Sequence, residues 1–435
     1  MRGRRQFLKR TLTGSGGFAL AGNPGNAANA DTIQNLDVYQ QGGLYKVRGR
    51  IDGRELKSAS TADAAIQFAV DQLGEGGGEV LLQCSTFRMG KQVNLSSRVT
   101  LRGSGAGTVL WIEESHDTGV ALMAREADAV TVSDLAIKAA RDTRAANAGV
   151  VIDNSGACAV RNILCVGLRE HGIWLRNNAF LCEVSGCQLA GTGKSGIFLE
   201  MLYRAGRGGD YVPNLVSNCI VYGGGIGIEA SRAIVANIVG CEVFQSGGYG
   251  FCVRNTSNSV LISGCRTFQT GSDAVMVDTS DEINITGNVF CWHTGHGIVL
   301  KKVTWGTVTG NEVIDTGSAN QDLEGLKLPA DFPYKNGIYL HSGTRGVSVT
   351  GNTIFNWPVA PAMDHGILED ETCEKNVLSA NNLNFCRADV SSRGTGSQVA
   401  NNVSYLPEPF RQRKPSVRLQ TFNTALMARF IDQLR

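Results

Sequence analysis

The sequence lacks any apolar run close to the roughly 18–20 residues that cross a membrane. It also lacks a strong basic excess, because its 41 lysines and arginines barely exceed its 39 aspartates and glutamates. Five basic residues precede the first acidic one, Asp31, so the rest of the chain has 36 basic residues against 39 acidic ones. We therefore expect neither a membrane span nor a nucleic-acid partner, which would need a basic patch.

No CxxC…CxxC spacing of the kind that binds zinc occurs among the twelve cysteines. Several cysteines instead occupy one point of a repeat, where other copies of the repeat carry asparagine. This position predicts an inward-facing ladder of buried thiols and hydrogen-bonded amides, and free cysteines rather than disulfides. The residues at this position are Cys187, Cys219, Cys241, Cys265, Asn288, Asn311 and Asn352.

The first thirty residues have the features of an export signal. Residues 4–9, RRQFLK, resemble the bacterial twin-arginine motif, and Ala28-Asn29-Ala30 is a small-x-small cleavage pattern. We therefore expect residues 1–30 to be a twin-arginine signal peptide and the mature protein to be soluble, in the periplasm or secreted. Twin-arginine export carries proteins already folded in the reducing cytoplasm, which would allow the thiols to stay free.

A motif of glycine, apolar, any, apolar, any recurs along the middle of the chain, at intervals that are mostly 23–25 residues. Between its copies a second strand-like motif recurs, as in CEVSGC, VLISGC, INITGN and VSVTGN. The copies of the first motif begin at Gly149, Gly172, Gly196, Gly225, Gly250, Ala274, Gly297, Gly337 and Gly366.

Short alternating strands at a period of about 23 residues predict a solenoid of parallel strands. This period favours a right-handed parallel β-helix with three strands per coil and about ten to twelve coils. We expect residues 31–405 to form this one all-β domain, with an N-terminal capping helix at about 61–74. Residues 406–435 are expected to form a tail with a short helix, in which Leu426, Phe430 and Leu434 share one side. That helix would dock on the last coil or on a partner chain, so a homo-oligomer is possible.

The segment from the predicted cap helix through residue 110 resembles the opening of the pectate-lyase-like family, which includes rhamnogalacturonase-like and epimerase-like β-helix proteins. The features that carry the resemblance are the cap helix, three glycines (Gly76 to Gly78) before the strand EVLL, and then SRVTLRGSGAGTVL. With the coils, it covers about residues 45–405. It implies action on an acidic polysaccharide, although the same fold also serves phage adhesins and structural proteins.

In each copy of the glycine motif the two apolar positions should face the core and the other two should face outward. Stacking of coils about 4.8 Å apart then predicts a stripe of ionisable side chains beside a partly aromatic one. This arrangement suits a long charged glycan, and the alternative is a solvated face of paired charges. The last outward position of successive copies holds Asp153, Arg176, Glu200, Glu229, Arg254, Asp278, Lys301, His341 and Asp370.

Removal of the proton beside a uronate carboxylate requires a base and a cation that neutralises the carboxylate. We expect Arg254, Lys301 and His341 to supply them, oriented by Asp278. Two carboxylates on successive copies, Glu200 and Glu229, are candidate ligands for Ca²⁺, the one cofactor that the residues suggest, with Asp210 as a third ligand. Side chains that suit sugar binding are Trp174, Arg176, Tyr211 and Tyr339.

Two other functions stay open. A glycoside hydrolase or transglycosylase would use paired carboxylates such as Glu200 and Glu229. Asp273 and His296 resemble the aspartate and Gly-His-Gly pattern of polygalacturonases, but Ser272 and Tyr249 stand where that family has further aspartates, so these two residues are second choices. The third reading is a non-catalytic glycan-binding or structural β-helix.

Overall fold

The computed structural model describes residues 35–139, 147–200, 213–317, 335–356 and 363–405, except 385 and 387. The predicted signal peptide, the C-terminal tail, Asp210 and Tyr211 lie outside these residues. No helix within the described ranges is long and apolar enough to cross a membrane.

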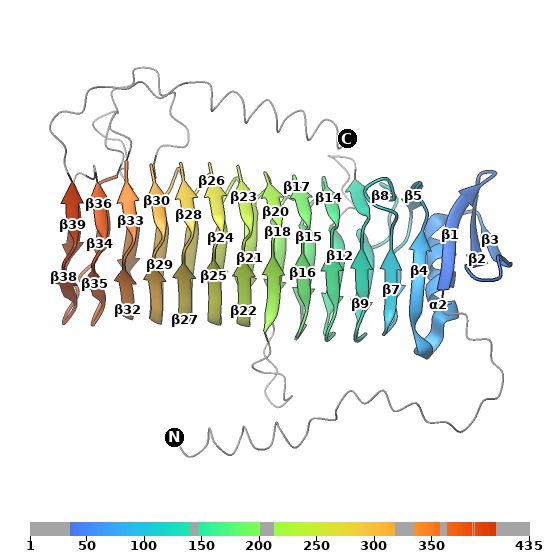
Figure 1. The fold of residues 1–435 in the computed structure, drawn as a ribbon, viewed down its shortest axis with the longest axis horizontal. Helices are drawn as coiled ribbons and strands as arrows, with labels where there is room; N and C mark the ends of the chain where they lie inside the picture. Colours follow the sequence, from blue (N-terminus) through green and yellow to red (C-terminus); the bar gives the residue numbers. More distant parts are fainter. Residues whose placement is uncertain are drawn as a thin grey trace, which may run out of the picture. The chain divides into compact units, whose positions relative to one another are not determined.

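The strands wind into coils, and each strand pairs in parallel with its counterpart in the coils before and after it (Figure 1). Two of the three faces belong to a 26-stranded sheet, and the third is a separate 13-stranded sheet. The architecture is therefore a parallel β-helix with three strands per coil, as predicted.

The first face carries the glycine motif. It consists of β6 (Val93–Leu95), β9 (Val120–Arg125), β12 (Ala148–Asp153), β15 (His171–Arg176), β18 (Ser195–Glu200), β21 (Ile226–Ser231), β24 (Phe251–Arg254), the first halves of β27 (Val275–Thr286) and β29 (Ile298–Thr309), β31 (Ile338–His341), β34 (His365–Glu369) and β37 (Ala388–Ser392).

The second face carries the other motif that the sequence shows. It consists of β1 (Asn35–Gln41), β4 (Gly78–Leu82), β7 (Val99–Arg102), β10 (Thr131–Ser133), β13 (Ala159–Arg161), β16 (Glu183–Ser185), β19 (Asn214–Ser217), β22 (Ile234–Val239), β25 (Asn258–Ser263), the second halves of β27 and β29, β32 (Arg345–Thr350), β35 (Val377–Ser379) and β38 (Gln398–Ala400).

The third face is built from shorter strands. It consists of β5 (Thr86–Met89), β8 (Val109–Ile112), β11 (Ala136–Ala139), β14 (Leu164–Val166), β17 (Gln188–Ala190), β20 (Ile220–Tyr222), β23 (Glu242–Phe244), β26 (Arg266–Phe268), β28 (Val289–Cys291), β30 (Glu312–Ile314), β33 (Thr353–Phe355), β36 (Asn382–Asn384) and β39 (Val403–Tyr405).

The predicted cap helix is confirmed as α2 (Ala62–Leu73), which is followed by the short 3₁₀ helix η1 (Gly74–Gly76). Its apolar side, including Ile66, Val70 and Leu73, is buried against the first coil. Two further strands, β2 (Leu44–Gly49) and β3 (Glu55–Ala59), pair antiparallel to extend β1. These elements cover the N-terminal end of the core, as a solenoid requires.

The glycine of the motif is needed because the chain approaches the next coil closely there. A Cβ at Gly172 would lie 2.1 Å from Leu189 Cδ2 and 2.7 Å from the Gly196 carbonyl oxygen. A Cβ at Gly297 would meet Val313 and the carbonyl of Gly337 equally closely. The recurring glycine is thus explained by a packing requirement that most coils share, and alanine is found at this position in the coil of Ala274.

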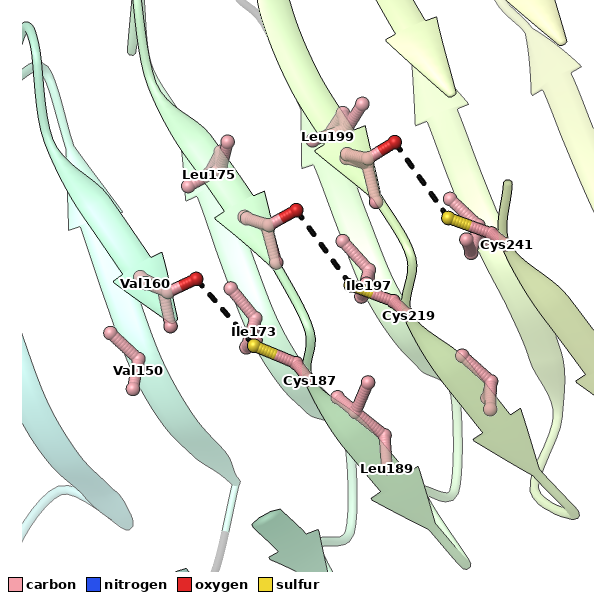
Figure 2. Close-up of a cluster of buried hydrophobic side chains, with 14 of the residues drawn as sticks. Val150, Val160, Ile173, Leu175, Cys187, Leu189, Ile197, Leu199, Cys219 and Cys241 are labelled. Carbon is pink, nitrogen blue, oxygen red and sulfur yellow. Dashed lines mark hydrogen bonds between the residues drawn. The ribbon is translucent and has the colours of Figure 1, made fainter. Parts of the chain in front are cut away.

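The predicted inward ladder of cysteine and asparagine is confirmed. Figure 2 shows Cys187, Cys219 and Cys241 on successive coils, where each thiol donates to a carbonyl of the preceding coil, such as Val160 at 3.5 Å. All twelve cysteines are free, and ten of them are buried. In later coils the amide of Asn311 donates to the Ile285 carbonyl at 2.9 Å and accepts from the backbone of Asn288 at 3.1 Å.

The register predicted at Gly225 is wrong. Phe198, not Glu200, pairs with Glu229, and Ser231 pairs with Arg254, so the motif begins at Gly227. The sequence GIGIE offers a glycine at both positions, and a shift of two residues leaves the alternation of inward and outward side chains unchanged. The register predicted at Gly366 is confirmed, since β31 pairs with β34 in that alignment.

We expect Asn311→Leu to lower the free energy of unfolding by about 1–3 kcal/mol, because it leaves buried backbone groups without hydrogen-bond partners. Asn382→Leu on the exposed side of β36 is the control and should change it by less than about 0.5 kcal/mol. Urea denaturation followed by circular dichroism measures both. Equal effects of the two substitutions would contradict a stabilising role for the ladder.

Candidate functional site

The predicted row of ionisable groups is assembled on the first face. Arg254 pairs in register with Asp278, Asp278 with Lys301, and Lys301 with His341. Their strands belong to four consecutive coils, so neighbouring Cα atoms are separated by about 4.8 Å. The row therefore places a cation, a carboxylate, a second cation and an imidazole side by side.

Three members of the row are engaged in ion pairs. Arg254 binds Glu229, which is 3% exposed and also accepts a 2.6 Å hydrogen bond from Ser195 Oγ. Lys301 Nζ lies 3.0 Å from Asp278 Oδ2. Partial burial alone would raise the pKa of Asp278, but hydrogen bonds from Lys301 and Thr279 hold it below its ordinary value. Arg254 thus neutralises a buried carboxylate, whereas the Lys301–Asp278 pair remains partly open to solvent.

His341 is the last of the four residues in this row. Its ring stacks on Tyr339 with centroids 4.5 Å apart and planes 14° from parallel, and its Nδ1 lies 2.9 Å from Ser342 Oγ. Burial and, to a smaller degree, the charge of Lys301 lower the pKa of His341, although Asp370 opposes the shift. The imidazole is therefore neutral near pH 7 and able to accept a proton.

A second row lies one position before the glycine of the motif. The backbone N–H of His296 donates to Asp273 Oδ1 at 2.7 Å, and the backbone N–H of Asn336 donates to His296 Nδ1 at 2.8 Å. Asn336 Oδ1 in turn lies 3.3 Å from His365 Nδ1. Because Nδ1 of His296 accepts a hydrogen bond, a neutral ring carries its proton on Nε2.

Burial perturbs both titratable groups at the start of this second row. It raises the pKa of the Asp273 carboxyl to about 6, against the opposing effects of the His296 N–H and of Lys335. It lowers the pKa of His296 to about 4, with further lowering by Lys335 and His341. Perturbed groups of this kind concentrate at functional sites.

Tyr339 joins the two rows. Its ring centroid lies 5.3 Å from that of His296 and 4.5 Å from that of His341. We call His296, Tyr339 and His341 the ring cluster. Lys301 is the neighbour of His341 in the first row, and Asp273 is the neighbour of His296 in the second.

Asn336 was not predicted from the sequence as a site residue. It directly precedes Gly337 and so occupies the same position of the repeat as Asp273 and His296.

Two of the other predicted sugar-binding residues, Trp174 and Arg176, lie elsewhere on the first face. Trp174 belongs to β15, six coils from β31, which is about 30 Å along the axis. Its ring stacks against Phe198 with centroids 5.9 Å apart, and the guanidinium carbon of Arg176 lies 4.4 Å from the ring centroid. Arg176 also pairs with Asp153 at 3.1 Å. Trp174 and Arg176 therefore form a packed cluster separate from the ring cluster.

Glu200 and Glu229, the two expected calcium ligands among the described residues, are not brought together. Glu200 pairs with Arg232 at 2.8 Å and Glu229 pairs with Arg254, and the two carboxylates differ by two residues in register. Among the described residues no group of three or more His, Cys, Asp or Glu side chains could hold a metal ion. The predicted stacking of Glu200 on Glu229 rested on the wrong register at Gly225. The hydrolase alternative that used this pair of carboxylates required the same stacking.

Comparison with known proteins identifies the fold. A family model described as the right-handed beta helix region matches residues 171–354, while no curated protein sequence matches the chain. The A-module of mannuronan C-5 epimerase AlgE6 from Azotobacter vinelandii has a TM-score of 0.60 at 15% identity, over 80% of this chain and 96% of that one.

Two further structures show how widely this fold is used. The catalytic unit of a GH87 α-1,3-glucanase from Streptomyces thermodiastaticus gives a TM-score of 0.58 at 13% identity, over 82% of this chain and 68% of that one. PfbA, a surface adhesin of Streptococcus pneumoniae, gives 0.54 at 15% identity, over 79% and 87%. At such identities the likeness concerns the fold alone, and the chain is a right-handed parallel β-helix.

We expect Asp273→Asn to raise stability at about pH 7.5. Because the folded pKa of Asp273 lies above its ordinary value of 3.8, the folded state binds this proton more tightly than the unfolded state does. Stability therefore falls as pH rises from about 4 to about 6, and the neutral amide avoids a loss of about 1–3 kcal/mol.

The advantage of Asp273→Asn over the parent should vanish below about pH 4, as measured by urea unfolding across the pH range. Asp278→Asn is the matched control, because the pKa of Asp278 is lowered and its ionised form is stabilised by Lys301. It should give no gain at about pH 7.5. A gain from both substitutions, or from neither, would contradict the assigned environment of Asp273.

Proposed function

We propose that the chain is an exported carbohydrate-active protein that cleaves an acidic, uronate-containing polysaccharide by β-elimination. The observation that carries this proposal is the neutral imidazole of His341, in register with Lys301 and stacked on Tyr339. A base, a cation and a phenol on one outward face are the groups that such an elimination requires.

In the proposed reaction His341 accepts the proton from the carbon beside the uronate carboxylate. Lys301 neutralises that carboxylate, which stabilises the negative charge that develops as the C–H bond breaks. The electron pair forms a carbon–carbon double bond while the bond to the glycosidic oxygen on the neighbouring carbon breaks. Tyr339 donates the proton that the leaving oxygen takes up, and its pKa, raised by burial, keeps the phenol protonated at neutral pH.

The other residues of the site position these groups. Asp278 holds Lys301 through their 3.0 Å ion pair. His296, fixed by the Asn336 N–H, presents its Nε2–H as a hydrogen-bond donor without adding charge. The proposed steps use no metal ion, and two of the candidate calcium ligands, Glu200 and Glu229, are paired with arginines.

Export by the twin-arginine route is part of the proposal and rests on residues 4–9 together with the state of the cysteines. Twelve free thiols, ten of them buried, fit a protein that folds in a reducing compartment before it leaves the cell. We therefore place the mature protein in the periplasm or outside the cell.

Hydrolysis is the second candidate, and Asp273 favours it. A carboxyl with a pKa of about 6 suits a general acid that protonates a glycosidic oxygen. Among the described residues, however, the groups that act on Asp273 are the His296 N–H and Lys335, and neither is the second carboxylate that hydrolysis requires. If no glycan is cleaved, the first face is instead a glycan-binding surface.

We expect Lys301→Ala, which removes the neutralising charge, and His341→Ala, which removes the base, each to lower the rate of polysaccharide cleavage by about 10²-fold or more. The assay follows the ultraviolet absorbance of unsaturated uronate ends released from pectate, alginate and glycosaminoglycans. Lys302→Ala, which removes an exposed lysine next in the chain, should keep full activity. New reducing ends without this absorbance would refute elimination, and undiminished activity of either first variant would refute the assigned site.

The fixed tautomer of His296 gives a second functional test. His296→Gln places an amide N–H near the position of Nε2, whereas His296→Asn can only replace Nδ1. We expect the glutamine variant to retain cleavage activity about tenfold better than the asparagine variant, since one hydrogen bond to charge in the transition state is worth roughly that factor. Equal kcat/KM values for the two variants would exclude a role for the Nε2–H donor.

A further inference from the structure

The third face carries an apolar stripe on its outer side. The central residue of each short strand points into the core, so the residue after it points outward. On six consecutive coils this outward position is half-buried and mostly apolar, and its members pair in register. We call these residues the third-face stripe: Tyr222, Phe244, Phe268, Cys291, Ile314 and Phe355.

The polar atoms at the stripe are already satisfied. The Tyr222 hydroxyl donates to Gln245 at 2.5 Å, and Nε1 of the adjacent Trp292 donates to Asp315 at 2.9 Å. The rings contact one another, with Phe268 and Trp292 centroids 4.9 Å apart. A sugar site combines aromatic rings with several convergent polar groups, so this stripe fits apolar side chains better than a glycan.

The chain itself supplies a segment that fits. Residues 421–435, TFNTALMARFIDQLR, lie outside the described residues, and their apolar side chains recur at helical spacing. As a helix they would be about 22 Å long. The stripe spans five coil steps, or about 24 Å. The large apolar residues of the segment are Phe422, Leu426, Met427, Phe430, Ile431 and Leu434.

The described chain also ends in a suitable place. Its last strand, β39, belongs to the third face and lies three strands beyond β30, which carries Ile314 (Figure 1). Fifteen residues separate Tyr405 from Thr421 and could extend over roughly 50 Å, more than the return path requires.

We propose that residues 421–435 form an amphipathic helix that packs along the third-face stripe. The helix covers the side chains of the stripe with Leu426, Phe430 and Leu434, and it holds the third-face strands of six coils together. This role is independent of the proposed reaction on the first face.

Cys291 provides a direct test, because it is the half-buried cysteine within the stripe, whereas Cys84 is exposed and the other ten are buried. The intact protein is treated with iodoacetamide at about pH 9, and labelling of each cysteine is followed by mass spectrometry. The double variant Leu426→Glu with Phe430→Glu should label Cys291 about tenfold faster than the parent. The two charges would release the helix of residues 421–435 from the stripe, and a covering segment of this size has only modest local stability. Ala425→Glu, on the opposite side of the helix, should leave the rate unchanged.

Cys84 serves as the internal standard, and the ten core cysteines must stay unlabelled if the coils remain folded. The proposal is overturned if Cys291 is labelled at the same rate in all variants. It is also overturned if protection of Cys291 requires an added oligosaccharide, which would make the stripe a sugar site. Protection that depends on protein concentration would overturn it in favour of a second copy of the chain.

Discussion

The in-register stacking of parallel coils is the constraint on which the rest of the structure depends. Each coil must place the same kind of side chain over its neighbour about 4.8 Å away, so every position of the repeat becomes a column. Inward columns hold glycine where the chains approach, and thiols or amides where a carbonyl of the preceding coil needs a donor. Side chains in the outward columns do not have to meet these packing and hydrogen-bonding requirements, so they can take part in binding or catalysis.

The architecture could be predicted because each coil repeats the same packing requirement in the sequence. The glycine of the motif and the alternation of cysteine with asparagine identified both the period and the inward face. The register at Gly225 could not be predicted, because GIGIE satisfies the motif in two alignments that bury the same side chains. Only the pairing with β18 and β24 distinguishes them, and it moves Glu229 from the last outward column to the middle one.

The row Arg254, Asp278, Lys301 and His341 was predicted as an in-register stack, and the structure shows it. What each member does there could not be read from the pattern. Glu229 forms an ion pair with Arg254, and the ring of Tyr339 contacts those of His296 and His341. These contacts join residues of different columns, whereas the repeat pattern predicts only which residues share a column. The third-face stripe could not be predicted for a similar reason, since each three-residue strand is too short to show an alternating pattern and no glycine marks its position.

The account centres on the claim that an acidic glycan binds the first face with one carboxylate against Lys301 and the adjacent C–H facing His341. A crystal structure of the His341→Ala variant with a bound uronate oligosaccharide tests this most directly. The account predicts a sugar carboxylate within hydrogen-bonding distance of Lys301 Nζ and a ring over the space left by the imidazole, beside Tyr339. An oligosaccharide bound at the Trp174 cluster, with Lys301 still paired only with Asp278, would contradict it.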